Sequence, residues 1–311
     1  MLEEEFKDVD ESDDFSSLPF RVTGERKNYP SATDVVVIRP PEAVSESEIQ
    51  GLASILSQRG FISILLPREE SRYDRWYPTD SFREVGQWLF ESGGSELEEI
   101  LQYARNLLPQ SELESIRSHS VRVPTEFTGG NYVHFDPSKL FVYAEDQMIG
   151  PNPKYSNDFL KRMRKRDEAE IKQVLGMMKK NGWQLVPVRT RGFKLPGKTT
   201  VNDEDLDFLL SLFQGKDNKP HAIVASSFVG RTPRKFSTHQ IPDSEALRGG
   251  CNIADLRQGK VLVIPNRLDA PTTHRILSQF AHPSINIIET PANFLDGGGG
   301  PRCSISAFRR A

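Results

Sequence analysis

A glycine-rich run that ends in a cysteine is the segment of this sequence best suited to chemistry. It spans 295–303 and reads LDGGGGPRC. Four consecutive glycines let the backbone take positive φ values and approach a ligand closely, and Pro301 stiffens the exit from the run. We expect the run to present the Cys303 thiol free of bulky screening side chains, as a nucleophilic thiol requires. The alternative is a flexible tail with an incidental cysteine.

The elements expected to position this cysteine are short β-branched strands that alternate with amphipathic helices. Residues 35–38 predict a buried strand, 45–58 a helix capped by its first residue, a serine, and 61–66 a second strand. Similar strand–helix–strand units occur within 140–188 and 261–288. None of these units leads into the Gly-rich phosphate turn of a dinucleotide-binding fold, and no Walker motif is present. The pattern therefore predicts one repetitive α/β domain, which repeats in architecture rather than in sequence.

Composition narrows the class of protein. The chain has 311 residues, 37% of them hydrophobic, and a formal net charge of -3, which argues against a dedicated nucleic-acid binder. Its two cysteines, Cys251 and Cys303, suit a reducing compartment, and no apolar run approaches the roughly 18 residues of a membrane span. We predict a cytoplasmic protein with an acidic, disordered leader over 1–20 and a single catalytic domain over 21–311.

Four short motifs occur in the order found in a known superfamily. They are Asp74–Phe82 (DRWYPTDSF), Phe127–Asn131 (FTGGN), Cys251–Ile253 (CNI) with the strand that follows it, and Gly298–Ser304 (GGGPRCS). Together they resemble the guanidine-modifying, or pentein, superfamily, which includes arginine and agmatine deiminases, dimethylarginine dimethylaminohydrolase and amidinotransferases. The resemblance covers 34–308. It implies a pseudo-fivefold α/β propeller of ββαβ modules with the active site in its central channel.

The resemblance also implies a reaction and its residues. Cys303 would attack a guanidinium carbon and form a thiouronium adduct with release of an amine or ammonia. Water would then complete a hydrolysis, or an acceptor amine an amidino transfer. Asp80 would bind the guanidinium through its N–H edges, and Glu145 would supply a second catalytic acid. Trp76 and Asn131 would belong to the substrate-binding wall.

Each of these roles has a structural alternative. Asp80 can simply cap the segment that follows it, and Trp76 can be a packing residue. Glu145 can be a solvent-facing charge at the end of a strand, where Asp146 competes for its role. Arg302 would bind a substrate carboxylate, or instead pair with a structural acid.

The superfamily's catalytic histidine is missing from its expected place. The family pattern His-x-Asp corresponds here to Asp205-Leu206-Asp207, so that Asp207 retains the carboxylate and Asp205 replaces the imidazole. An ordinary aspartate, with a pKa of about 3.9, is a poor proton donor near neutral pH. His134 and His239 are the best substitutes for the missing imidazole. The second hypothesis is therefore a pseudoenzyme that binds a guanidinium compound or a protein arginine without turning it over.

Other partners receive less support. The segment 161–166, KRMRKR, carries five cations and suggests nucleic-acid binding, but acidic residues follow it at helical spacing and favour a salt-bridged surface. No cluster has metal-ligand spacing, and neither an organic cofactor nor a nucleotide site is indicated. We predict a small guanidino compound or a peptidyl arginine as the partner, and leave the oligomeric state open. The polar segments 189–202 and 230–250 are either substrate-selecting loops or ordinary surface loops.

Overall fold

The computed structural model describes most of the chain. The described residues are 21–23, 34–41, 43–66, 82–92, 96–105, 108–124, 127, 129–149, 158–196, 205–292, 294 and 300–309. The predicted leader over 1–20 and the predicted site residues Trp76 and Asp80 lie outside them.

The described strands form five small sheets of an α/β fold. In each sheet a first strand pairs antiparallel with a second, and the second pairs parallel with a third. The crossover between the second and third strands carries helix. The first sheet and its crossover comprise β4 (Phe82–Val85), β5 (Trp88–Ser92), α3 (Glu96–Ala104), α4 (Gln110–Ser118) and β6 (Ser120–Val123), and the second comprise β7 (Tyr132–Phe135), β8 (Leu140–Ala144), α5 (Glu145–Met148), α6 (Asp158–Lys180) and β9 (Gln184–Val188). The third comprise β10 (Leu210–Gln214), β11 (Pro220–Ala225), η6 (Ser226–Arg231) and β12 (Ser237–Ile241), and the fourth comprise β13 (Ala254–Leu256), β14 (Val261–Ile264), α9 (Pro271–Phe280) and β15 (Asn286–Glu289). The fifth comprise β16 (Ile305–Arg309), β2 (Asp34–Ile38), α1 (Glu46–Gln58) and β3 (Phe61–Leu65).

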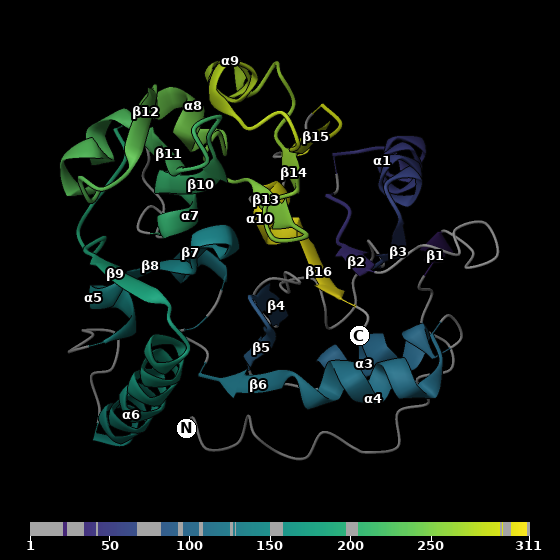
Figure 1. The fold of residues 1–311 in the computed structure, drawn as a ribbon, viewed down its shortest axis with the longest axis horizontal. Helices are drawn as coiled ribbons and strands as arrows, with labels where there is room; N and C mark the ends of the chain where they lie inside the picture. Colours follow the sequence, from purple (N-terminus) through teal and green to yellow (C-terminus); the bar gives the residue numbers. More distant parts are fainter. Residues whose placement is uncertain are drawn as a thin grey trace, which may run out of the picture.

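The fifth sheet joins segments from the two ends of the sequence. Strand β16 pairs antiparallel with β2, with Ile305 opposite Ile38, and β1 (Arg21–Thr23) adds to the other edge on β3. None of the five sheets is closed on itself. First strands of neighbouring sheets contact one another, since β16 contacts β4 and β13, and β10 contacts β7. In Figure 1 several first strands lie nearer to the middle of the view, and α1, α3, α4, α6 and α9 lie toward the rim.

The predicted strand–helix units are confirmed, with ends shifted by a residue or two. Helix α1 starts after Ser45, whose hydroxyl accepts from the Glu48 amide at 3.3 Å while the Glu48 carboxylate accepts from the Ser45 amide at 2.8 Å. This reciprocal capping box fixes the helix start. Its core-facing residues Ile49, Leu52 and Leu56 are buried.

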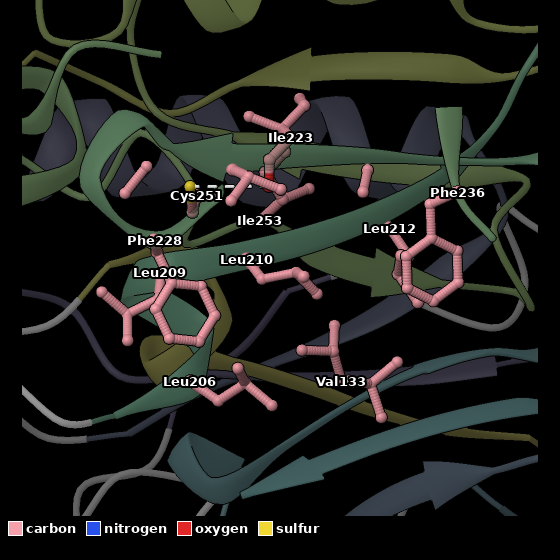
Figure 2. Close-up of a cluster of buried hydrophobic side chains, with 14 of the residues drawn as sticks. Val133, Leu206, Leu209, Leu210, Leu212, Ile223, Phe228, Phe236, Cys251 and Ile253 are labelled. Atoms are coloured by element: carbon pink, nitrogen blue, oxygen red, sulfur yellow. Dashed lines mark hydrogen bonds between the residues drawn. The ribbon is translucent and has the colours of Figure 1, made fainter. Parts of the chain in front are cut away.

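Buried side chains of neighbouring sheets share hydrophobic clusters. One cluster combines residues of β7 to β14 and includes Cys251, whose thiol donates to the Ile223 carbonyl at 3.7 Å (Figure 2). Short turns precede the first strands at one end of this packed core: η3 (Gly129–Asn131) before β7, α7 (Leu206–Leu209) before β10, and α10 (Pro301–Ser304) before β16. Contacts between α7 and η3, and between α10 and η3, bring these turns together.

In the described part of the chain, no helix has both the length and the apolar character needed to cross a membrane. Helix α6 carries the basic segment, and Arg166 lies 3.7 Å from Glu170 one turn later, as predicted for a salt-bridged face.

Candidate active site

Cys303 sits in a short helix directly before a strand. Helix α10 follows Gly300 and Pro301, and β16 continues from it. The residue is partly exposed. Its thiol donates to Asp207 Oδ2 at 3.6 Å and accepts from Asn252 Nδ2 at 3.2 Å. The predicted nucleophile therefore lies between a carboxylate and an amide rather than in a featureless tail.

Asn252 is the hub of this cluster. The side chain is fully buried, and its Nδ2 contacts Asp207 Oδ2 at 3.0 Å as well as the thiol. Its Oδ1 accepts from the Arg302 backbone amide at 2.8 Å. A Cβ placed on Gly300 would lie 2.2 Å from this oxygen, so only glycine allows the run to approach so closely. One amide thus fixes both the nucleophile's helix and its carboxylate partner.

Asp207 is a buried acid with a perturbed pKa. It lies in α7, and its residue is 1% exposed. Burial raises the pKa of the carboxyl, against the opposing effects of Arg302 and Arg83 and of the hydrogen bonds from Cys303 and Asn252. This carboxyl therefore holds a proton more readily than an ordinary aspartate, which a proton acceptor and donor near neutral pH requires.

Arg302 is buried rather than exposed at the surface. The residue is 1% exposed, its guanidinium donates to the Tyr132 carbonyl, and its Nε lies 4.0 Å from Asp207 Oδ2. Burial, with Arg83 nearby, lowers the pKa of Arg302 to about 9. The Arg83 guanidinium in turn covers the Tyr132 ring at 5.2 Å. Arg302 therefore pairs with an acid of the Cys303 cluster.

The other described candidates lie around this cluster. Asp205 directly precedes α7 and is half-buried, and a Cβ placed on Gly130 would lie 3.1 Å from its Cγ. It therefore packs against the turn that carries Asn131. Glu145 is the half-buried first residue of α5, directly after β8 as the sequence predicted. Burial, and then the charge of Glu145, raise the pKa of Tyr143. Glu145 and Asp146 line a separate groove on this part of the fold.

Neither of the two proposed substitute histidines, His134 and His239, contacts the Cys303 thiol in the described part of the chain. His134 is 4% exposed, with Nε2 3.6 Å from Asp136 Oδ1, and burial, then Arg83 and Arg302, hold its pKa well below the usual range. His239 bonds to His221 at 2.9 Å. The remaining histidines also have other partners: His119 with Ser118, His221 with Asp217, His274 with the Pro265 carbonyl, and His282 with Ser284.

Sequence reasoning did not assign a role to Asn252, Arg83 or Tyr132. Asn252 was present in one of the four motifs, and its place in that motif was the available signal. Arg83 is the second residue of β4 and Tyr132 the first residue of β7, and nothing in their local sequence indicates that they surround a buried arginine. No group of three or more His, Cys, Asp or Glu residues among the described positions is arranged to hold a metal ion.

Comparison with known proteins gives a likeness in structure rather than in sequence. No protein-family model matches the chain, and no curated protein does. A dimethylarginine dimethylaminohydrolase adduct has a TM-score of 0.58 and 14% identity, covering 88% of this chain and 99% of that one. The enzyme of Pseudomonas aeruginosa, a cysteine-to-serine mutant with citrulline, has a TM-score of 0.55 and 13% identity, covering 88% and 98%.

A second kind of enzyme shares the fold. The N-terminal domain of ArgZ, an arginine dihydrolase from Cyanobacteria, has a TM-score of 0.52 and 10% identity, covering 89% of this chain and 98% of that one. These neighbours are guanidine-modifying enzymes of the pentein superfamily. The resemblance predicted from four motifs is therefore confirmed at the level of the fold.

Proposed function

We propose that the chain is a cysteine-dependent guanidine-modifying enzyme with Cys303 as its nucleophile. In this proposal residues 21–311 form one catalytic domain, and the five sheets surround a common axis as a pseudo-fivefold propeller. The repeated strand order and the contacts between first strands support that arrangement. The turns before β7, β10 and β16 would then form the wall of a central active site.

One observation carries the proposal: the Cys303 thiol lies between the Asp207 carboxylate at 3.6 Å and the Asn252 amide at 3.2 Å. The thiol proton passes to Asp207 as sulfur forms a bond to the guanidinium carbon. The C–N bond to the leaving amine then breaks, and Asp207 returns the proton to that nitrogen. Because burial raises the pKa of Asp207, both transfers lie within reach near neutral pH.

The resulting thiouronium is resolved by a second nucleophile. Water gives a ureido product and restores the thiol, whereas an acceptor amine gives amidino transfer. In this scheme Asn252 stabilises negative charge on sulfur through its N–H group, and Arg302 orients Asp207 through the contact between its Nε and the Asp207 carboxylate. Asp80, Trp76 and Asn131 remain the proposed contacts of the substrate, and Glu145 and Asp205 remain the further proposed catalytic acids.

The second candidate is a protein that binds a guanidinium group without turnover. Two observations favour it: Asp205 stands where the superfamily has its catalytic histidine, and the histidines of the chain have partners of their own. Under this alternative Asp207 and Asp205 still attract a guanidinium, but the leaving amine receives no proton. The partner in both cases is a small guanidino compound or a peptidyl arginine, met in the reducing environment of the cytoplasm.

Product analysis by mass spectrometry tests the first candidate. The full chain is incubated with arginine, agmatine, methylarginines, guanidino acids and an arginine peptide, each with and without glycine or ornithine. A deimination product about 1 Da heavier, a released alkylamine or an amidino-transfer product identifies the reaction. Cys303→Ala should abolish it, while Cys251→Ala retains it.

Measuring both binding and turnover with these substrates distinguishes the enzyme from the non-catalytic binder. Turnover that depends on Cys303 establishes the enzyme and its reaction type. Guanidine binding with no product from any substrate favours the non-catalytic binder. Product that persists in Cys303→Ala contradicts the proposed nucleophile.

A further inference from the structure

An open groove borders the sheet of β7, β8 and β9, apart from the contacts of the Cys303 cluster. It has a volume of about 850 Å³ and lies where α5, the end of β9 and η6 meet. Three arginines line it, Arg189, Arg191 and Arg231, together with Glu145 and Asp146. Ile149, Pro187 and Val188 add apolar surface. Small-molecule sites commonly combine this size, a partly apolar lining and a few polar groups.

The arginine-bearing turn after β9 is held in place. The Asp146 carboxylate accepts from the Thr190 amide at 3.0 Å and from the Arg191 amide at 3.1 Å. The Arg191 guanidinium donates to the Asp146 backbone carbonyl, and Gly192 closes the turn with a φ of 70°. The Asp146 carboxylate is thus hydrogen-bonded to backbone N–H groups, and these bonds fix the backbone of the turn that carries the arginines.

Arg231 is fixed beside Arg189. Its Nη1 donates to the Arg189 carbonyl at 3.1 Å, and its guanidinium lies 5.1 Å from the centre of the Phe193 ring. Both arginines are exposed, and neither has an ion-pair partner among the residues that the structure describes. The Arg231 guanidinium is therefore held at the backbone of Arg189, and the three arginines of the groove outnumber its two acids, Glu145 and Asp146, so the lining favours an anion.

We propose that this groove binds a small organic oxyanion, a carboxylate or a phosphate on an apolar body, through Arg189 and Arg231. Guanidinium groups recognise both kinds of oxyanion by paired N–H donors. The apolar residues would contact the body of the ligand. The inference goes beyond the proposed reaction, because Arg189 and Arg231 have no role in that reaction, and Glu145 is the lining residue that the groove shares with it.

Isothermal titration calorimetry with the full chain at low salt tests the site. The probes are glutarate for the carboxylate, phenyl phosphate for the phosphate, and glutaramide as a neutral match for glutarate. We expect saturable binding of at least one anionic probe, none of glutaramide, and at least tenfold weaker binding in Arg189→Gln and in Arg231→Gln.

Matched variants distinguish binding in this groove from a general effect of surface charge and from binding at the Cys303 cluster. Arg234→Gln removes an exposed arginine that follows η6 without lining the groove, and should leave the affinity unchanged. Cys303→Ala should also leave it unchanged, so a failure of the proposed reaction does not affect this test. Absence of saturable binding, equal weakening by Arg234→Gln, or loss of binding in Cys303→Ala would overturn the proposal.

Discussion

The two cysteines of the chain lie in opposite environments, although a single residue connects them. Cys251 is fully buried in a hydrophobic cluster, where burial raises the pKa of its thiol well above the usual range (Figure 2). Cys303 is partly exposed and contacts a carboxylate and an amide. Asn252 follows the first cysteine in sequence and contacts the second in space.

The comparison shows how the core supports the chemistry. Cys251 and Ile253 are both buried, and this anchors the backbone on each side of Asn252. The Asn252 side chain points out of the core toward Cys303, Asp207 and the helix that carries the thiol. The first thiol is therefore a packing group, and the second is a candidate nucleophile whose geometry depends on that packing.

The largest expected effect distinguishes the two thiols. Cys303→Ala should reduce turnover by at least about 1,000-fold, because the covalent step is lost. Cys251→Ala should keep turnover within a few-fold and lower the free energy of unfolding by about 1–3 kcal/mol, because it removes buried packing. Steady-state kinetics and urea unfolding of both variants check this. The comparison fails if both variants lose activity while remaining folded.

Asp207→Asn should have the next largest effect. The amide cannot accept the thiol proton, so we expect turnover to fall by about 100-fold to 10,000-fold. Asp205→Asn is the matched control, since Asp205 is the neighbouring acid that packs on the Gly130 turn. A larger loss of kcat in Asp205→Asn than in Asp207→Asn would assign the proton transfer to the other acid.

Gly300→Ala tests the connection between the two regions. An added Cβ would meet the Asn252 amide at 2.2 Å, so we expect the amide to shift and turnover to fall by about tenfold or more. Gly51→Ala is the control, because nothing lies within 4 Å of a Cβ there and the site is inside α1. That variant should gain about 0.5–1 kcal/mol of stability and retain full activity. Equal activity of the two variants would contradict the role of Asn252.

The smallest expected effect is a dependence of the free energy of unfolding on pH, and it comes from the polar groups around Arg302. Burial raises the pKa of Asp255, which lines a small cavity with Arg302, to about 7. The native state then binds more protons than the unfolded chain between the ordinary carboxyl pKa of about 4 and this value. The free energy of unfolding therefore falls as pH rises through that window. Asp255→Asn should flatten the profile in urea titrations, and an unchanged slope would count against it.

Local sequence predicted the elements well and the site only in part. The N-cap serine, Ser45, and the β-branched runs are short-range signals, so α1 and the predicted strands appear where expected. The pairing of β16 with β2 joins distant segments and had no local signal. The same holds for Arg302, whose burial against Tyr132 depends on how β7 packs beside α10.

Cys303 is proposed to be the nucleophile of a site that binds a guanidinium group. The most direct test is competitive labelling with two reagents, 2-chloroacetamidine, which carries an amidinium, and neutral 2-chloroacetamide. Each labelling rate is divided by the rate for the urea-unfolded chain, and the labelled cysteine is mapped by mass spectrometry. We predict that the native chain reacts at Cys303 alone, about tenfold or more faster with the cationic reagent, and that Asp207→Asn removes this preference. Equal relative rates for the two reagents, or labelling of Cys251 to the same extent as Cys303, would contradict the account.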